Sequence, residues 1–448
     1  MISWVFSVSS SYAASLLELY NLAELNDPQL KIAESERLAT LEKKPQARAL
    51  LLPQVTANAN VNENWRTEDV FLDHGQSVEN TAVGYQLSLT YALYHRDLRI
   101  LSKQADSQMG ETEANYESVR QSLMERLSVR YFKVLAAEDN LQFTKGAKEA
   151  FQRQLDQAKQ RFEVGLIAAT DVQEAQSGYD LAVADEIQAQ NELDNAREAL
   201  REITGNYYDT LASLREDVTL VAPEPADIHI WTRIALEKNP QIIANQYAVE
   251  TARQEIDRQR AVYQPTVDVV GTHSYQDVIR GEFSAGTSPM NSSIGLQLNY
   301  NLYDGGTRSS RIREAQQRHN QSLDNLEKQR RAVQLQTHNA YLNVMANISR
   351  VKALKQALLS TKTALEAVQR GFEVGTRTSV DVLNAQRDLL QAQRNYASAR
   401  YDYVLNILRL QQAVGLLGLE DLYRINALLR TPGAEPALPA KTVKNKGK

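Results

Sequence analysis

The sequence of 448 residues contains the same series of segments twice, about 210 positions apart. Residues 161–176, RFEVGLIAATDVQEAQ, return as 371–386, GFEVGTRTSVDVLNAQ, and residues 87–99, LSLTYALYHRDLR, return as 296–308, LQLNYNLYDGGTR. Two shorter pairs keep the same order, NDPQL with KNPQI and LLPQVTANANV with YQPTVDVVGTH. A tandem duplication of this length is typical of a pseudo-symmetric object built around an axis.

The duplication defines the expected organisation of the chain. Residues 2–14 are small and apolar, and Ser11-Tyr12-Ala13 suits signal-peptide cleavage after Ala13, although no basic residue precedes them. The tail is rich in Pro and then basic, which is typical of disorder. We predict a truncated signal peptide over 1–13, a first repeat over 14–205, a linker over 206–227, a second repeat over 228–430 and a disordered tail over 431–448.

Composition excludes several classes of site. The chain has no Cys, and therefore neither a disulfide framework nor a thiolate metal site. Its net charge of −5 gives no basic footprint for nucleic acid. No phosphate loop or cofactor motif is present, and the six His are scattered without metal-ligand or catalytic-triad spacing. We therefore expect no enzyme activity, no cofactor, no metal site and no nucleic-acid partner.

Four stretches alternate apolar and polar residues, which indicates strands with one apolar and one polar face. A water-soluble sheet with one wet face would also alternate. Here the polar faces carry Asn, Gln, Ser and Thr in place of Lys and Glu, and the lengths suit tilted membrane strands. Tyr94 and Tyr303 are expected at matching strand ends, as in an aromatic girdle. The four stretches are 55–61, 83–93, 267–275 and 294–302.

Four strands cannot close a barrel, and lipid does not tolerate an open sheet edge. Several copies of the chain must therefore combine. A trimer would supply twelve strands and a dimer eight, and the strand pattern by itself is compatible with both.

Two stretches without Pro, 97–162 and 307–372, predict helices too long for a compact domain. At 1.5 Å per residue, about 65 helical residues reach roughly 100 Å. Two shorter helices, 32–50 and 241–262, are expected to lead into the strands.

A turn with Gly at the bend follows each long helix, and Thr170 and Ser379 are candidate N-caps for the two returning helices. Apolar residues then recur at spacings of three and four, which predicts coiled-coil hairpins. Glu186 interrupts the first of these seams once. The seam positions are Ala175, Tyr179, Ala182, Ala189, Leu193, Ala196, Leu200 and Ile203 in the first hairpin, and Ala385, Leu389, Ala392, Tyr396, Ala399, Tyr403 and Leu410 in the second.

Together these features resemble the TolC family of outer-membrane channel-tunnels, from about Leu16 to Leu429. The most specific segments are QRFEVGLIAATDVQEAQ with LDNAREALREITGNYY, and FEVGTRTSVDVLNAQ with ARYDYVLNILRLQQAVGLL. The resemblance implies a mixed α and β membrane protein, a homotrimer with a twelve-stranded barrel in the outer membrane of a Gram-negative bacterium and a coiled-coil tunnel across the periplasm. It also implies export of small molecules, proteins or both, driven by an inner-membrane RND or ABC transporter through a periplasmic adaptor protein.

The resemblance further implies a gate at the periplasmic end of the tunnel. An Asp of the family's gate network falls on Asp171, an Arg falls on Arg377, and a Tyr falls on Phe372, whose ring has no hydroxyl to donate. Two Asp that line the family's constriction and bind cations fall on Asp381 and Asn384. A trimer would therefore carry three carboxylates there in place of six, and we expect weaker cation binding and a looser gate.

By spacing alone, Asp171 and Asp381 also suit simple stabilisation of helix N-termini, and Arg377 suits an exposed turn residue. The tips of the turns are expected, by the same resemblance, to receive the adaptor. These tip residues are Val164, Gly165 and Leu166 in the first turn, and Val374, Gly375 and Thr376 in the second.

Two other functions fit part of the sequence. A non-channel periplasmic coiled-coil scaffold would explain the helices and the duplication, but not four alternating strands with Asn and Gln on their polar faces. A receptor or adhesin would use the loops 64–81 and 277–292, and this role is compatible with export.

Overall fold

The computed structural model describes residues 13–68, 76–215, 218–280 and 290–430. The predicted signal peptide, apart from Ala13, and the predicted tail lie outside these residues, as do parts of both loops considered for ligand binding. The chain divides into two compact units, and each unit takes segments from both sequence repeats. The first unit comprises Met1–Ala33, Tyr116–Pro240 and Arg330–Lys448, and the second comprises Glu34–Asn115 and Gln241–Gln329.

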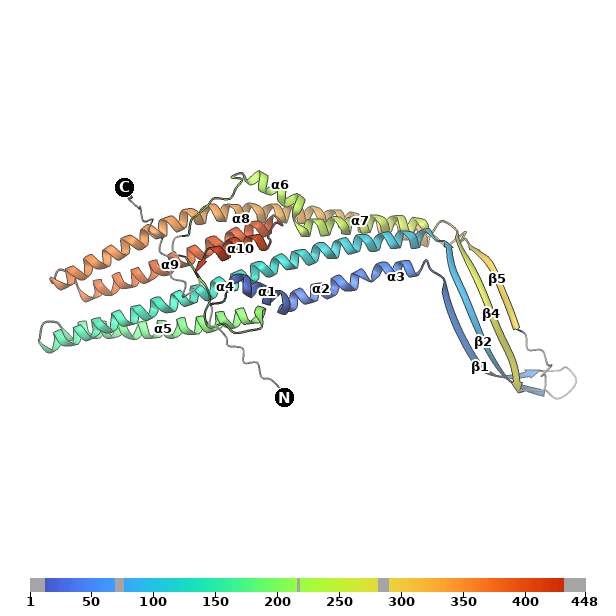
Figure 1. Cartoon of the computed structure of the whole chain (residues 1–448), viewed down its shortest axis with the longest axis horizontal. Helices are drawn as coiled ribbons and strands as arrows, with labels where there is room; N and C mark the ends of the chain where they lie inside the picture. The colour runs from blue at the N-terminus through green and yellow to red at the C-terminus, as the bar shows by residue number, and fades with distance from the viewer. Residues whose placement is uncertain (1–12, 69–75, 216–217, 281–289, 431–448) are drawn as a thin grey trace, which may run out of the picture. The chain divides into compact units, whose positions relative to one another are not determined.

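Both halves of the chain present short helices, two long strands, one long helix and a returning helix in that order, although the first half begins with three short helices and the second with two, and α10 occurs only in the second (Figure 1). The first half contains α1 (Leu16–Asn26), α2 (Pro28–Leu41), α3 (Lys43–Ala49), β1 (Gln54–Glu68), β2 (Gln76–Tyr94), α4 (Arg96–Glu163), α5 (Ala169–Thr204) and β3 (Ser213–Leu214). The second half contains α6 (Ile228–Lys238), α7 (Pro240–Ala261), β4 (Thr266–Arg280), β5 (Met290–Asn299), α8 (Thr307–Glu373), α9 (Ser379–Ala413), α10 (Leu419–Ala427) and β6 (Leu429–Arg430).

The two long helices confirm the prediction from the absence of Pro, with 68 residues in α4 and 67 in α8. None of the helices in the described ranges is long and apolar enough to cross a membrane. The shorter helix predicted from residue 32 is in fact two helices, α2 and α3, interrupted at Glu42. Pro45 explains the interruption, because its ring excludes a continuous helix through the carbonyl of Leu41 but is tolerated in the first turn of α3.

The second unit contains a four-stranded antiparallel sheet in the order β1-β2-β4-β5. Its register brings the predicted apolar residues of all four strands onto one face. One row across the sheet consists of Val55, Leu89, Gly271 and Ile294, and the next row, on the opposite face, consists of Thr56, Ser88, Thr272 and Ser293.

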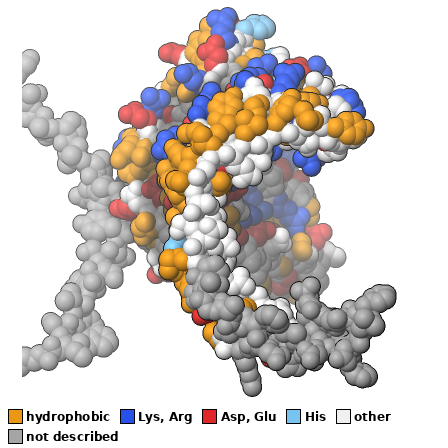
Figure 2. All heavy atoms as spheres, turned by 90° about the vertical axis from the view of Figure 1, so that its right-hand side faces the viewer, with side chains coloured by type: hydrophobic (Ala, Val, Ile, Leu, Met, Phe, Trp, Pro, Cys, Tyr) orange, Lys and Arg blue, Asp and Glu red, His pale blue; other side chains and the backbone are white. Residues whose placement is uncertain are grey.

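The apolar face of the sheet is exposed in the single chain. Ile294 is 78 % exposed and Leu296 is 71 % exposed. Seen from its end, the sheet is a curved wall with hydrophobic side chains along its outer side (Figure 2). Large aliphatic side chains gain about 1.5–3 kcal/mol each when they leave water, so this face requires an apolar surrounding.

The fourth strand begins and ends earlier than the sequence predicts. β5 ends at Asn299, so Tyr303 lies outside the strand, whereas Tyr94 is the last residue of β2. The prediction that these two Tyr occupy matching strand ends is therefore wrong. Thr266, the first residue of β4, pairs with Asn299, so the ladder between β4 and β5 ends there, and a turn follows Tyr303 in which Gly305 and Gly306 adopt φ values of 65° and 88°. The Asp304 carboxylate accepts hydrogen bonds from the Gly306 and Arg308 amides at 3.1 and 2.8 Å.

The first unit contains two helical hairpins: the part of α4 from Tyr116 onward with α5, and the part of α8 from Arg330 onward with α9 (Figure 1). Every Ala, Leu and Ile of the first predicted seam is buried, and Ala392, Ala399, Tyr403 and Leu410 are buried in the second. Glu186, which interrupts the first seam, pairs with the ammonium group of Lys148 on α4. An ion pair thus replaces an apolar contact at this level of the hairpin.

The linker between the repeats is attached to the helices of the first unit. Its short strand β3 pairs with β6. The Tyr131 hydroxyl donates to the Ala212 carbonyl at 2.6 Å, and the Arg400 guanidinium donates to the Leu214 carbonyl at 3.2 Å. The Tyr403 hydroxyl donates to the Val221 carbonyl at 3.0 Å and accepts from the Val221 amide at 2.7 Å. Side chains of α4 and α9 therefore satisfy backbone groups of a segment that has little secondary structure of its own.

Candidate functional site

The two turns that close the helical hairpins share one backbone geometry. Gly165 and Gly375 adopt left-handed φ values of 74° and 77°, which residues with a Cβ rarely adopt. The Leu166 amide donates to the Arg161 carbonyl at 2.8 Å, and the Thr376 amide donates to the Gly371 carbonyl at 2.8 Å. These bonds satisfy the last carbonyls of α4 and α8. The duplication in sequence is therefore preserved as a duplication in structure.

Both returning helices begin earlier than the predicted caps. The N-cap of α5 is Ala168, so the prediction of Thr170 is wrong, and the N-cap of α9 is Thr378, so the prediction of Ser379 is wrong by one residue. In α9 the Thr378 hydroxyl accepts from the Asp381 amide at 3.2 Å, and the Asp381 carboxylate accepts from the Thr378 amide at 2.9 Å. This reciprocal capping box fixes the start of the helix.

Asp171 of the predicted gate network and Asp381 of the predicted constriction both contact their own turns in the single chain. Asp171 accepts a hydrogen bond from the Ala168 amide at 3.3 Å. The hydrogen bonds from the Thr378 amide and hydroxyl, together with the nearby charge of Arg377, hold the pKa of Asp381 below its usual value. Helix stabilisation, the simpler of the two interpretations, thus accounts for contacts of both residues. No ion pair joins Asp171 to Arg377 among the residues that the structure describes.

Phe372 has a partner that the sequence did not predict. The guanidinium carbon of Arg161, on α4, lies 4.7 Å from the centroid of the Phe372 ring, on α8. This distance is within the range of a cation–π interaction, whose contribution is about 0.5–1 kcal/mol at an exposed site. In the second repeat Gly371 occupies the position of Arg161. The segments RFEVG and GFEVG otherwise match, so the difference between Arg161 and Gly371 is the sequence signal that could have identified Arg161 as a residue with a role of its own.

The two hairpins meet through buried contacts near their turns. Leu383 of α9 is 5 % exposed and packs with Phe151 of α4 and Ala182 of α5. A Cβ on Gly178 would lie 3.0 Å from a methyl carbon of Leu383, so the absence of a side chain there allows the approach. The Gln154 side-chain amide donates to the Ser379 carbonyl at 3.1 Å. A movement of one hairpin against the other would have to break these contacts.

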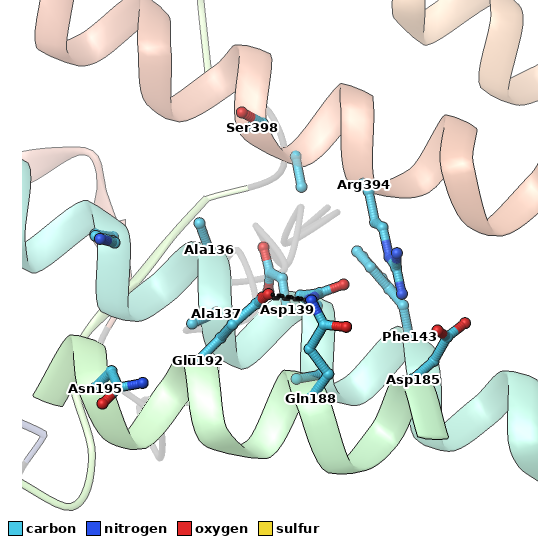
Figure 3. Close-up of a pocket in the computed structure, with 14 residues that line it drawn as sticks. Ala136, Ala137, Asp139, Phe143, Asp185, Gln188, Glu192, Asn195, Arg394 and Ser398 are labelled. Atoms are coloured by element: carbon cyan, nitrogen blue, oxygen red, sulfur yellow. Dashed lines mark hydrogen bonds between the residues drawn. The ribbon is translucent and has the colours of Figure 1, made fainter. Parts of the chain in front are cut away.

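Further along the hairpins, α4, α5 and α9 enclose a groove with a volume of about 620 Å³ (Figure 3). Arg394 extends from α9 toward α5, where Asp185 lies. The Asn140 side-chain amide donates to the Glu192 carboxylate at 3.3 Å. The Tyr401 hydroxyl donates to Asp139 at 2.6 Å. The described residues contain no cluster of three His, Asp or Glu that could hold a metal ion. The lining combines these charged and amide side chains with Phe143 and several Ala.

We expect Asp139→Asn to stabilise the protein increasingly as pH rises. Burial raises the pKa of Asp139, although the hydrogen bond from Tyr401 and the charge of Arg400 oppose this rise. A carboxyl with a raised folded-state pKa is favourable at low pH and loses that contribution as pH rises through the folded-state pKa. The difference in thermal unfolding midpoint between variant and wild type should therefore grow from pH 4 to pH 7. Exposed Asp194→Asn is the control, and equal behaviour of the two variants would contradict the prediction.

The chain matches the outer membrane efflux protein family over residues 19–206 and 231–416. It is 35 % identical to the outer membrane protein TolC of Vibrio cholerae over 424 residues, which cover 94 % of this chain and 95 % of the relative. It is 26 % identical to the alkaline protease secretion protein AprF of Pseudomonas aeruginosa, over 95 % of this chain and 91 % of the relative. The solved structure of CusC superposes with a TM-score of 0.78 at 18 % identity, over 90 % of this chain and 92 % of that one.

The chain therefore belongs to the outer membrane efflux protein family. It has the channel-tunnel fold and is an outer-membrane channel of the efflux and secretion class, with a tunnel in the periplasm. Such channels work with a transporter system, and the family is one of transport proteins and not of enzymes. The coiled-coil scaffold considered from the sequence is excluded as the function of the chain.

Proposed function

We propose that three copies of the chain form one channel that is gated at the hairpin turns. The observation that carries this proposal is the sheet of the second unit. β1 and β5 each pair on one side only within the described residues, and the face of the sheet is apolar. Unpaired edges are costly in lipid, so neighbouring copies must supply the missing strands. Three four-stranded sheets make a barrel of twelve strands.

In this channel, Asp171, Phe372 and Arg377 belong to the gate network, and Asp381 and Asn384 line the constriction. The network joins neighbouring copies, which explains why the single chain leaves Arg377 exposed. The cation–π contact of Phe372 with Arg161 takes the place of a hydrogen bond that a Tyr at this position would donate. The gate of this chain therefore relies on fewer hydrogen bonds than one with Tyr at that position.

A periplasmic adaptor protein docks at the turns and links the channel to an inner-membrane RND or ABC transporter, which supplies the energy. The side chains of Val164, Leu166 and Val374 are 70–76 % exposed at the tips, where apolar residues favour a protein partner. Beside them a groove of about 860 Å³ opens between α4 and the α8–α9 hairpin. Its lining includes Arg161, Val164, Phe372 and Val382. Exported cargo is a small molecule, a protein or both, because one tunnel is able to serve either.

The proposal is tested by single-channel recording of the purified full-length protein in a planar lipid bilayer. We expect a small, stable conductance from particles with the mass of three chains. A protein that inserts into lipid as a single chain, or that gives no conductance at any voltage or pH, would refute the trimeric channel. Cross-linking of β1 to β5 between copies, through Cys pairs placed on facing edge residues, gives an independent measure of the assembly.

We expect Asn384→Asp to strengthen block of the channel by a trivalent cation. The variant doubles the carboxylates at the proposed constriction, and added negative charge lowers the concentration for half-block by a factor on the order of ten. Gln173→Glu, an exposed position on α5, adds the same charge to the other hairpin and should leave the block unchanged. If both variants change the block equally, Asn384 does not line the constriction.

A further inference from the structure

Exposed basic residues begin both long helices where these adjoin the sheet. On α4, Arg96, Arg99 and Lys103 are exposed and follow one another at spacings of three and four, so they share one face of the helix. On α8, Arg311 and Arg313 are exposed in the second turn, and the first turn contains no acidic residue. All five belong to the second compact unit, which also contains the sheet.

These positions are electrostatically unfavourable for a helix alone. A helix N-terminus carries a partial positive charge, so cations in its first turns are disfavoured. Of the nearby acids, Asp106 pairs with Lys44 and Asp304 pairs with Arg308 at 2.8 Å, while Asp97 lies 3.7 Å from a ring nitrogen of His95. Within the described part of the chain, no ion pair neutralises Arg96, Arg99 or Lys103. Their charge therefore adds to that of the helix end.

Tyr94 connects this basic face with the apolar face of the sheet. A register shift between Ala92 and Tyr94 pairs Tyr94 with Val267, whose neighbour across the sheet is Leu298. Tyr94 thus lies at the end of the apolar face that is next to the start of α4, and its hydroxyl donates to the Gln264 side chain at 2.9 Å. The guanidinium carbon of Arg99 lies 5.9 Å from the centroid of the Tyr94 ring. The basic face of α4 consequently begins where the apolar face ends.

We propose that Arg96, Arg99 and Lys103 form a binding site for the phosphate group of anionic phospholipids in the periplasmic leaflet of the outer membrane. The apolar face of the sheet receives the acyl chains, Tyr94 occupies the interface, and the two guanidinium groups donate to the phosphate oxygens. Arg311 and Arg313 add positive charge near the start of α8, in the same compact unit. The N-terminus of α4 contributes its partial positive charge to the same phosphate.

The charge on this face selects for lipids with a net negative headgroup. A zwitterionic lipid offers the same phosphate, but its ammonium group is repelled by three neighbouring cations. Basic residues near an anionic membrane surface each contribute enough to change affinity several-fold. Removal of all three charges should therefore weaken binding of an anionic lipid by about tenfold or more.

The test measures binding of phosphatidylglycerol and phosphatidylcholine to the full-length protein in neutral detergent, by native mass spectrometry over a range of lipid concentrations. The variant is the triple substitution Arg96→Gln, Arg99→Gln, Lys103→Gln. The matched control is Lys352→Gln, Lys355→Gln, Lys362→Gln, which removes the same charge from exposed positions of α8 in the first compact unit. We expect wild type and control to prefer phosphatidylglycerol by about tenfold or more, and the variant to lose this preference.

Four results would contradict the site. The first is equal binding of the two lipids by wild type, and the second is an equal loss of preference in variant and control. The third is displacement of the lipid by millimolar inorganic phosphate, which would show a site for free phosphate and not for a membrane lipid. The double substitution Arg96→Lys, Arg99→Lys should keep the preference, and its loss there would also contradict a site selected by charge. Recording of conductance from the same preparations separates this test from that of the trimeric channel.

Discussion

We expect Arg377→Ser to increase the open probability of the channel at least tenfold. In the proposed gate the Arg377 guanidinium bonds to a neighbouring copy, and a hydrogen bond to a charged group contributes about 1.5–3 kcal/mol. Each 1.4 kcal/mol changes an equilibrium tenfold. The structure is compatible with this role, because Arg377 is exposed and has no ion pair within the described residues.

The measurement is the open probability, and with it the time-averaged conductance, in single-channel recordings of wild type and variant at equal voltage and salt. Arg370→Ser is the matched control, because it removes the same charge from an exposed residue in the last turn of α8. If both variants raise conductance equally, the effect comes from the loss of any positive charge at this end of the tunnel and not from a specific contact of Arg377. An unchanged conductance in Arg377→Ser would assign Arg377 to its own turn, where its charge lowers the pKa of Asp381.

We expect Arg126→Met to destabilise the first unit by about 3–5 kcal/mol, the cost of leaving one partner of a buried ion pair alone. The guanidinium of Arg126, on α4, donates to both carboxylate oxygens of Asp27 at 3.2 and 2.8 Å. The Asp27 side chain is only 2 % exposed, and it also accepts from the Leu30 amide at 3.0 Å at the start of α2. Met keeps the length and helix propensity of the side chain but leaves the carboxylate without its cation.

Arg130→Met provides the control four residues further along α4. Arg130 pairs with Glu202 at 3.4 Å, but the side chains are 36 % and 72 % exposed, so its removal should cost about 1 kcal/mol or less. Thermal unfolding midpoints in detergent compare the two variants. Adding Asp27→Asn to Arg126→Met should recover part of the loss, because the unpaired charge is then absent. Similar midpoints for both single variants would show that the buried pair contributes no more than an exposed one.

Much of the fold follows from local patterns in the sequence. Three patterns reflect hydrogen bonding and burial within a few helical turns or within one strand. They are the absence of Pro over 65 residues, the spacing of Ala and Leu in the seams, and the strict alternation from Val83 to Leu93. These features predicted α4, α8, the two hairpins and the four strands. The ends of these elements were predicted less accurately, because one or two side chains decide where a helix or strand ends. The early end of β5 and the caps Ala168 and Thr378 are examples.

Only part of the site could be found in the same way. The duplicated turns and their carboxylates are visible as motifs, and their helix-capping contacts agree with the simpler of the two interpretations of Asp171 and Asp381. The contact between Arg161 and Phe372 and the insertion of Leu383 beside Gly178 join residues more than 200 positions apart. No local periodicity encodes such partners.

The sequence by itself determined the two long helices, their returning partners, the four long strands and the family, because periodicity, proline content and a tandem repeat are properties of the chain read in order. The tertiary structure alone decided the strand order β1-β2-β4-β5, the single apolar face that results from it, and the contacts by which the two hairpins meet. Those features depend on which distant segments pack together. That choice is made by the burial of whole surfaces and the satisfaction of polar groups across the fold, and not by any one segment.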